Sequence, residues 1–316
     1  MSLTNILPYA LSKGDTIGII APASSVQELE VELGIASIEA RGYRVQRGKY
    51  LYASHADNGY LAGEDALRID DLHRMFEDPS INAIFCAGGG YGSMRLFGKL
   101  DIELIRANPK IFVGFSDITS LHLAIGQSAN RVTFHGKMVV GLDKLDSAST
   151  DCLWKQLESL EPFGLMPVDP ERLTTLVPGE VVGELAGGCL CLLAHACGSK
   201  YSPDFRGKIV LIEDVGEPIY RLDRFLSQLI NAGAFDETLG FIIGTATAWE
   251  KQEADPPKST LDALWKSFFV PMNKPTITDF PFGHVHNPLT LPLGGGAKLD
   301  ATNKTVALLE ASVQRR

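Results

Sequence analysis

The first half of the chain alternates short apolar segments with amphipathic ones, and this alternation limits the folds that it can adopt. Residues 16–21, 83–86 and 111–115 read as short buried strands, each followed closely by proline, glycine or serine. Residues 26–41 and 64–77 lie between them and carry apolar side chains at helical spacing. Strands that alternate with helices predict parallel βαβ units, in which helices cover both faces of one sheet.

A change in composition divides the 316 residues, a length sufficient for two domains. Residues 143–180 are richer in Pro, Ser, Thr and Asp, so we interpret them as a connection between domains. They separate an N-terminal domain, 1–142, from a C-terminal domain, 181–316. The tail, 297–309, predicts a hairpin that turns at Thr302-Asn303. The expected fold class is therefore α/β, with a parallel-sheet domain followed by an α/β domain with a β-rich tail.

Charge and composition exclude several classes of function. The formal net charge is −9 and the pI is about 5.3, whereas nucleic acids and anionic lipid surfaces attract basic clusters. We find no apolar run of about 18 residues and no secretory signal, so we expect neither a membrane span nor export. The five cysteines are odd in number and lie mostly in apolar segments, which favours reduced thiols in the cytoplasm.

Two short patterns raise the question of a metal. Cys189-x-Cys191 lacks a second ligand pair at the spacing of a zinc site. His284-x-His286 could reach one metal from an extended loop, but no third ligand can be identified for it. We therefore expect no metal and no other cofactor, and a zinc hydrolase that uses the two histidines remains an alternative.

The segment 110–120 is the most informative part of the chain for function. A short apolar run ends at Gly114, Ser116 follows, and a helix-like segment begins just after it. A serine at a sharp strand-to-helix turn projects its hydroxyl above the sheet edge, close to the unpaired N–H groups of the new helix. This is how several unrelated hydrolases present a nucleophile. The structural alternative is that Ser116 or Asp117 only caps the helix.

Two further reactive groups follow predicted strands. Glu213 comes after 208–212, and His284 lies in a loop after 276–278. Ligands of parallel α/β sheets gather beyond the carboxyl ends of the strands. A serine nucleophile needs a base, and a carboxylate must hold that base in the right tautomer. Glu213 could instead be a solvated carboxylate and His284 a turn residue, and His135, which ends another strand, is a second possible base.

The glycine-rich run 88–92 has three interpretations. It could bind a phosphate through backbone N–H groups, although it is not the Gly-x-Gly-x-x-Gly fingerprint of a dinucleotide site. It could form an oxyanion hole together with the N–H of Asp117, which would stabilise a tetrahedral intermediate. It could also be a tight turn that needs positive φ.

Taken in order along the chain, these motifs resemble the LD-carboxypeptidase family of serine peptidases. That family includes muramoyltetrapeptide carboxypeptidases and microcin C self-immunity peptidases. The matching segments include Gly-Phe-Ser-Asp at 114–117 and Glu-Asp-Val-Gly-Glu at 213–217. The others are residues 17–24, 89–92, 135–136, 187–188, 211–218, 220–224 and 283–284.

The resemblance implies a fold and a set of site residues. It implies two α/β domains, the first with a flavodoxin-like parallel sheet, and an active site in the cleft between them. The catalytic residues would be Ser116, Glu213 and not Glu217, and His284 and not His286. The oxyanion donors would be the N–H groups of Asp117 and Gly89.

The resemblance also implies an activity: release of the terminal D-alanine from muropeptide tetrapeptides during murein recycling in the cytoplasm, by a possible homodimer. An immunity-type peptidase that cleaves a peptidyl-nucleotide antibiotic is the alternative within the family. A catalytically silent small-molecule-binding protein is the alternative outside it.

Gly88 and Cys189 stand where relatives often carry arginine and asparagine, which leaves the substrate preference open. Candidates for substrate binding are Tyr91, Arg95, Arg221, Arg224 and His286, although a surface ion pair or an interdomain contact is the competing role for each arginine.

Overall fold

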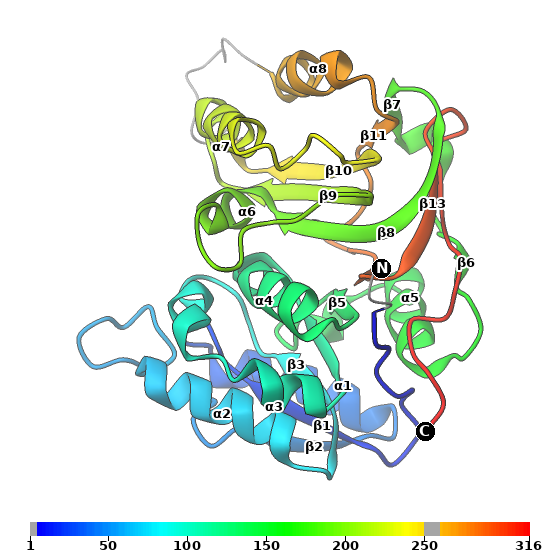
Figure 1. The fold of residues 1–316 in the computed structure, drawn as a ribbon. Coiled ribbons are helices and arrows are strands. Elements are labelled where there is room, and N and C mark those ends of the chain that lie inside the picture. Colours follow the sequence, from blue (N-terminus) through cyan, green and yellow to red (C-terminus); the bar gives the residue numbers. More distant parts are fainter. Residues whose placement is uncertain (1–4, 250–259) are drawn as a thin grey trace. The chain divides into compact units, whose positions relative to one another are not determined.

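A computed structural model describes residues 5–249 and 260–316 of the chain (Figure 1). The chain forms two compact units. The first contains the N-terminal part up to Leu160 together with Leu289–Pro292 and Ala311–Arg316. The second contains Glu161–Pro288 and Leu293–Glu310. The α/β fold class expected from the sequence is confirmed in both units.

The first unit is built on a six-stranded sheet with the order β12-β5-β4-β3-β1-β2. The pairs from β2 to β5 are all parallel, as the strand–helix alternation predicts. The order 2-1-3-4-5 of these strands is that of flavodoxin-like folds. The strands are β1 (Thr16–Ile20), β2 (Arg44–Arg47), β3 (Ile81–Cys86), β4 (Ile111–Gly114), β5 (Thr133–His135) and β12 (Leu291–Leu293).

Helices cover both faces of this sheet. One face packs on α1 and α5, whose buried residues Ile35 and Trp154 share a core with Ile19, Phe85 and others of the strands. The opposite face packs on α2, α3 and α4 (Figure 1). The helices are α1 (Glu28–Ala40), α2 (Asp65–Glu77), α3 (Ile102–Ala107), α4 (Thr119–Ala129) and α5 (Ser147–Glu158), with short 3₁₀ turns η1 (Ser93–Lys99), η2 (Ser116–Ile118) and η3 (Leu142–Lys144).

The second unit is built on an eight-stranded mixed sheet with the order β6-β14-β13-β8-β9-β10-β11-β7. Strands β8 to β11 are parallel, and antiparallel strands flank them on both sides. The predicted tail hairpin is confirmed, because β13 and β14 pair antiparallel around the predicted turn. The strands are β6 (Gly164–Leu165), β7 (Thr174–Val177), β8 (Glu180–Cys189), β9 (Lys208–Val215), β10 (Gly240–Thr247), β11 (Thr276–Thr278), β13 (Gly296–Asp300) and β14 (Thr305–Leu308).

The helices of the second unit are α6 (Leu190–Ala196), α7 (Ile219–Asn231) and α8 (Leu261–Met272), with a 3₁₀ turn η4 (Pro170–Arg172). In Figure 1, α6 and α7 lie side by side along β8, β9 and β10. The apolar stripe of α7, which includes Leu222, Leu226 and Leu229, is fully buried. No helix in the described residues is long and apolar enough to cross a membrane.

The division into units differs from the expected boundaries at residues 142 and 181. Helix α5 lies inside the expected connection, yet it belongs to the first unit. The reason is Trp154, whose indole stacks on Tyr43 at 5.1 Å and on Phe85 at 5.9 Å between ring centroids. Asp146 caps this helix by accepting a hydrogen bond from the N–H of Ser149. The polar composition of the segment reflects the solvent-facing side of α5.

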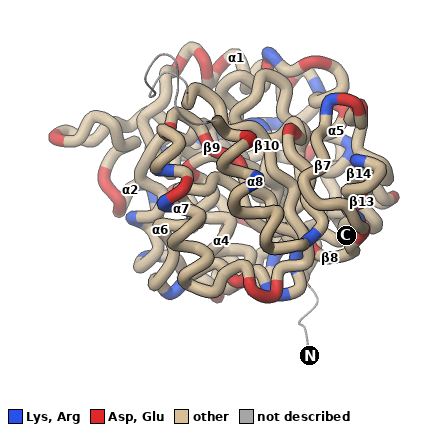
Figure 2. The backbone as a smooth tube through the Cα atoms, turned by 90° about the horizontal axis from the view of Figure 1, so that it is seen from above, with Lys and Arg blue, Asp and Glu red and all other residues tan. Residues whose placement is uncertain are grey.

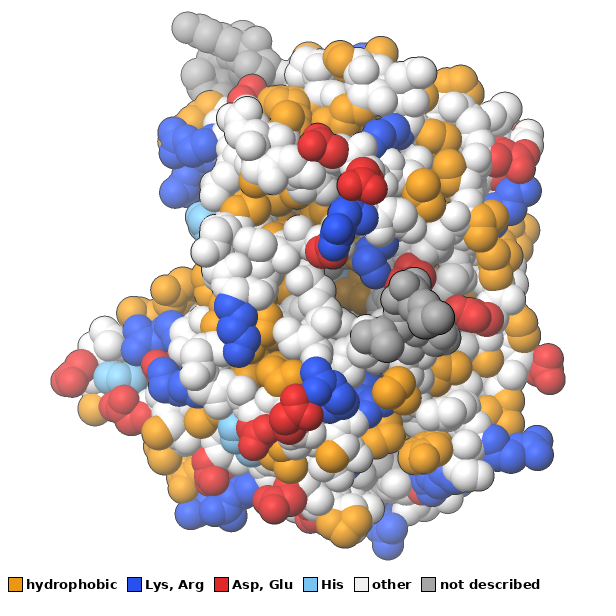
Figure 3. Space-filling model, in the orientation of Figure 1, with side chains coloured by type: hydrophobic (Ala, Val, Ile, Leu, Met, Phe, Trp, Pro, Cys, Tyr) orange, Lys and Arg blue, Asp and Glu red, His pale blue; other side chains and the backbone are white. Residues whose placement is uncertain are grey.

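Charged residues of both signs are interspersed along the chain (Figure 2). On the face of the molecule shown in Figure 3, Lys and Arg side chains lie among Asp, Glu and apolar ones. Many exposed cations have an acidic neighbour, for example Arg47 with Glu32 and Arg206 with Asp204. That the protein does not bind nucleic acid remains a prediction from this charge balance.

Candidate active site

The parallel strands of the first unit bring several polar residues to one edge of its sheet. Ser24 follows β1, the glycine-rich loop 88–92 follows β3, and Ser116 follows β4. The N–H of Ser24 donates to the carbonyl of Gly89 at 3.1 Å, which ties the loops after β1 and β3 together. This edge contains the point where the strand order reverses, between β1 and β3.

Ser116 occupies the strained turn that its sequence context predicts. Its φ is 64°, a left-handed value that few residues other than glycine adopt. It is partly exposed, whereas Phe115 and Asp117 on either side are buried. A side chain at Gly114 would collide with Ile118, with its Cβ 2.7 Å from Cγ2, so only glycine lets the chain turn so sharply here. Strain of this kind at a single polar residue is typical of a nucleophile elbow.

Neither Ser116 nor Asp117 caps the following helix with its side chain. The residues at the N-cap positions of η2 and α4 are Phe115 and Ile118, and neither makes a side-chain cap. The Asp117 carboxylate instead accepts the N–H of Ser93 at 2.7 Å, and Ser93 Oγ donates to the Asp117 carbonyl at 2.5 Å. Burial raises the pKa of Asp117, and the hydrogen bonds from Ser93 oppose this shift. Ser93 thus holds the residue that follows Ser116.

A buried histidine holds the strand that leads into Ser116. His122 Nε2 lies 2.8 Å from the carbonyl oxygen of Gly114, and its Nδ1 lies 2.9 Å from Thr133 Oγ1. The N–H of Gly136 donates to the same carbonyl at 3.1 Å. Sequence reasoning missed His122, because it sits at an apolar position of α4 with no motif around it. His122 lies eight residues after Gly114 in the sequence, and the two residues come into contact only because α4 packs against β4.

His122 makes the stability of the protein depend on pH. Burial lowers the pKa of His122 to about 4, below the ordinary value of 6.5, so the folded state prefers the neutral ring. The unfolded chain takes up a proton below about pH 6.5 and the folded one only near pH 4. The free energy of unfolding should therefore fall by about 3 kcal/mol as the pH drops from about 7 to 4.

The measurement is urea unfolding across this pH range for the wild type and for His122→Gln. The neutral amide does not titrate, so the variant should lose this part of the pH dependence even if its stability is lower throughout. An identical slope in both proteins would contradict the assignment.

The glycine-rich loop lies directly against Ser116. A Cβ added to Gly89 would stand 3.0 Å from Ser116 Cβ and 3.2 Å from its Oγ, so the backbone of Gly89 borders the hydroxyl. Gly90 and Gly92 have φ values of 99° and 126°, so the tight-turn interpretation of this loop holds as well. The N–H of Tyr91 donates to Ser24 Oγ at 3.0 Å. The loop is therefore held in a fixed conformation beside the serine.

A buried arginine holds the same loop in place through hydrogen bonds. Arg68 of α2 is 1% exposed and donates to the carbonyls of Pro22, at 2.5 Å, and Gly92, at 2.9 Å. Its guanidinium also pairs with Asp65 at 2.5 Å. It thus joins the turn after β1 to the loop after β3. Arg68 lies on the same buried face of α2 as Leu72, and no motif in the sequence assigns a basic residue at this position to such a role.

In the second unit, Glu213 and His284 form a hydrogen-bonded pair. Glu213 is near the end of β9 and 2% exposed, and its Oε2 lies 2.6 Å from His284 Nδ1. The same oxygen accepts the backbone N–H of His284 at 3.2 Å. The interpretation of Glu213 as a solvated carboxylate is therefore wrong. A carboxylate on Nδ1 fixes the tautomer in which Nε2 of the neutral ring is the basic nitrogen.

Close packing around Gly283 fixes this pair. Gly283 has a φ of 79°, and a Cβ there would lie 2.4 Å from the Glu213 carboxyl carbon. Thr247 Oγ1, at the end of β10, donates to the carbonyl of His284 at 3.3 Å. The loop after β11 can therefore bring an imidazole against Glu213 only because the preceding residue is glycine.

The predicted substrate-binding residues all lie at or near the surface. Arg95 pairs with Asp65 at 2.8 Å, and Arg221 pairs with Glu217 at 2.9 Å. Both arginines thus form the surface ion pairs that were the alternative to substrate binding. The remaining three are also accessible: Arg224 lies over the ring of Tyr220 at 5.5 Å, Tyr91 is 54% exposed and meets the edge of Tyr60, and His286 is exposed.

The alternatives built on other histidines find little support. His135 is 1% exposed and its ring lies among those of Phe115 and His122, at 5.9 and 6.3 Å between centroids. For the zinc alternative, the described residues hold a single cluster of three potential metal ligands, which includes neither His284 nor His286. His284 Nδ1 already faces Glu213.

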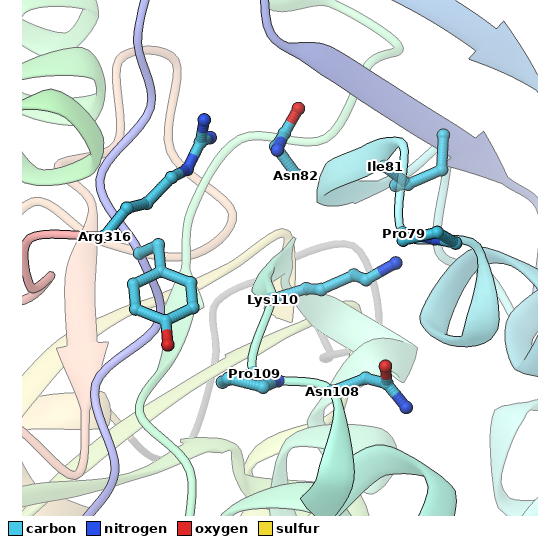
Figure 4. Close-up of a pocket in the computed structure, with 8 residues that line it drawn as sticks. Pro79, Ile81, Asn82, Asn108, Pro109, Lys110 and Arg316 are labelled. Atoms are coloured by element: carbon cyan, nitrogen blue, oxygen red, sulfur yellow. The ribbon is translucent and has the colours of Figure 1, made fainter.

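A separate pocket lies at the other edge of the first sheet (Figure 4). Its lining includes Ile81 and Lys110, at the amino ends of β3 and β4, whereas Ser116 follows the carboxyl end of β4. Lys110 Nζ donates to the carbonyls of Met75 and Asp78, and Arg316 pairs with Asp15. The cations of this pocket are thus engaged in holding the fold together.

Comparison with known proteins identifies the family. A family model described as LD-carboxypeptidase N-terminal domain matches residues 17–136, and one described as LD-carboxypeptidase C-terminal domain matches residues 182–299. A probable murein peptide carboxypeptidase of Bacillus subtilis is 38% identical over 98% of this chain and 96% of its own length. The murein tetrapeptide carboxypeptidase of Pseudomonas aeruginosa is 30% identical over 90% of this chain and 92% of its own.

A third relative and a solved structure extend the comparison. The microcin C7 self-immunity protein of Escherichia coli is 25% identical, with 96% of each chain covered. The crystal structure of a protein similar to it, from Bacillus anthracis, superposes with a TM-score of 0.86 at 26% identity, covering 96% of this chain and 99% of the other. The resemblance carried by the sequence motifs is thereby confirmed, and the chain belongs to the LD-carboxypeptidase family.

Proposed function

We propose that the protein is a serine carboxypeptidase that removes the terminal D-alanine from muropeptide tetrapeptides, with Ser116, His284 and Glu213 as its catalytic triad. The observation that carries the proposal is the strained, partly exposed Ser116, together with a histidine already oriented by a buried glutamate. The names of the relatives at 38% and 30% identity, both murein peptide carboxypeptidases, support this substrate class.

In the proposed reaction, Ser116 Oγ attacks the carbonyl between the diaminopimelate residue and the terminal D-alanine. His284 Nε2 takes the hydroxyl proton and then gives it to the departing amine. Glu213 holds the ring through Nδ1 and stabilises the imidazolium that forms. A water molecule, activated by the same histidine, then hydrolyses the acyl-enzyme and frees Ser116. These reaction steps require no cofactor.

We assign the oxyanion hole to the backbone N–H groups of Asp117 and Gly89. Both residues border Ser116, one through the chain and the other by the close approach of the glycine loop. One such donor typically lowers the barrier by about 3–4 kcal/mol. Ser93 and Arg68, which hold the two segments, act as positioning residues.

The terminal carboxylate of the substrate needs a cation to bind it. Arg95, Arg221 and Arg224 remain our candidates, with Tyr91 and His286 as neighbours of the peptide. A carboxylate that binds Arg95 or Arg221 must compete with Asp65 or Glu217, so we expect either contact to be weaker than an unshared guanidinium would give.

The direct test is to incubate the protein with disaccharide tetrapeptide and identify the products by mass spectrometry. We expect free D-alanine and the disaccharide tripeptide. Intact substrate after prolonged incubation with folded protein would refute the proposal.

The second candidate is cleavage of a peptidyl-nucleotide antibiotic, favoured by the 25% identity to the self-immunity protein over 96% of both chains. A parallel assay with an aminoacyl adenylate sulfamate separates the two. Preference for the nucleotide by kcat/KM would reverse the assignment. A cytoplasmic location and a homodimer remain predictions from the family resemblance.

A further inference from the structure

Two cysteines and an aspartate of the second unit converge where β8 passes into α6. Cys189 ends β8, Cys191 lies in the first turn of α6, and Asp214 follows Glu213 on β9. One ligand atom from each, the two Sγ atoms and a carboxylate oxygen, all lie within 4.8 Å of one another. The proposed mechanism uses none of these three side chains.

The spacing of the two sulfurs suits a shared metal ion. Cys189 Sγ and Cys191 Sγ are 3.5 Å apart. Two thiolates at the usual zinc–sulfur distance of about 2.3 Å from one ion are separated by about 3.8 Å in a tetrahedral site. A shift of a few tenths of an ångström therefore converts the present contact into a ligand pair. The three residues would leave a fourth position for water.

Backbone hydrogen bonds hold the carboxylate in place before any ligand arrives. Asp214 Oδ2 accepts the N–H of Cys191 at 2.8 Å, and Oδ1 accepts the N–H of Val215 at 2.8 Å. The first of these bonds ties the carboxylate to the residue that carries one of the thiols. Preorganised ligands of this kind lower the entropic cost of binding.

Electrostatics at the cluster favours a cation. Cys189 is 3% and Asp214 2% exposed, and no ion pair joins Asp214 to a basic side chain of the described residues. Burial and the neighbouring Glu213 raise the pKa of Asp214 to about 7. The hydrogen bond with Cys191, burial, and the charges of Asp214 and Glu213 raise the pKa of Cys189. A divalent cation would offset the negative charges that Cys189 and Asp214 take on when they lose their protons.

We propose that Cys189, Cys191 and Asp214 form a binding site for a thiophilic divalent cation, with Zn²⁺ as the best match to two thiolates and one carboxylate. Binding releases the two thiol protons to solvent and forms two metal–sulfur bonds and one metal–oxygen bond. Cys191 is only half-buried and gives the ion its route in. The site does not depend on the proposed peptidase activity.

The test is a titration of tag-free protein, reduced with a phosphine and freed of metal, first with Co²⁺ and then with Zn²⁺. Thiolate-to-cobalt charge-transfer absorption reports sulfur ligation, and its loss as Zn²⁺ displaces Co²⁺ gives the zinc affinity. We expect one equivalent of each metal to bind with this signature.

The variants are Cys191→Ser and Asp214→Asn, with Cys197→Ser as the matched control, because Cys197 is a partly buried thiol at the end of the same helix. Cys191→Ser should lose most of the charge-transfer absorption and at least about 100-fold in zinc affinity, and Asp214→Asn about 10–100-fold. Cys197→Ser should match the wild type.

The proposal fails if the wild type shows no charge transfer, or if Cys191→Ser binds Co²⁺ with the wild-type spectrum. It fails equally if Cys197→Ser loses the signal. Circular dichroism and a urea midpoint for each variant show that it is folded, and Cys191→Ser, at the more exposed position, decides the matter if Asp214→Asn does not fold.

Discussion

Replacing Ser116 with alanine is expected to lower kcat/KM for D-alanine release by about 10⁴–10⁶-fold, because no other group can form the acyl-enzyme. The fold should persist, since the left-handed φ of 64° is about as unfavourable for alanine as for serine. The measurement is D-alanine released from disaccharide tetrapeptide, followed by a coupled oxidase assay.

Ser128→Ala is the matched control, because Ser128 lies on α4, the helix that follows Ser116, toward its far end. It should retain wild-type turnover, and both variants should unfold at a urea concentration close to that of the wild type. Undiminished turnover by folded Ser116→Ala would remove the serine from the mechanism and with it the proposed triad.

Replacing Glu213 with glutamine is expected to lower kcat by about 10⁴-fold with little change in KM. The amide preserves size, but its N–H₂ group can donate to His284 Nδ1, which lies 2.6 Å from the carboxylate oxygen in the wild type. The neutral ring would then carry its proton on Nε2 and could not accept one from Ser116. The loss of the buried charge would also leave the imidazolium unstabilised.

Glu217→Gln provides the control, since Glu217 is the neighbouring residue of the same type. Glu217 pairs with Arg221 at the surface, so the variant should keep kcat within a few-fold of the wild type. A loss of kcat in Glu217→Gln as large as in Glu213→Gln would show that the acid has been misassigned.

Local sequence patterns predicted the parts of the fold that local physics decides. The strand–helix alternation predicted the parallel sheet of the first unit, and the glycine two residues before Ser116 predicted the sharp turn. Glu213 and His284 became candidates because each follows a predicted strand, and the ordered motifs of the family then singled them out as a pair. Their side chains are 71 residues apart in sequence, and no periodicity links them.

The remainder depends on contacts between distant segments. His122 and Arg68 are read from the sequence as ordinary helix residues, yet each is buried and holds a loop of the site. Helix α5 was hidden inside a polar segment, because its identity as a core helix depends on Trp154 reaching Tyr43 and Phe85. Such partners can be assigned only when the tertiary structure is known.

The last residues of the chain return to the first unit, and this has a consequence for its biosynthesis. Gln314 exchanges backbone hydrogen bonds with Pro8 and Ala10, at 2.9 Å each, and β12 neighbours β5 in the sheet that presents Ser116. A nascent chain from which β12 and Gln314 have not yet emerged therefore lacks an edge strand of this sheet and the contacts that Gln314 makes with the N-terminal segment. Until these residues are available, the N-terminal half should stay susceptible to proteolysis, and a fragment that stops at Leu160 should be less stable than the complete first unit.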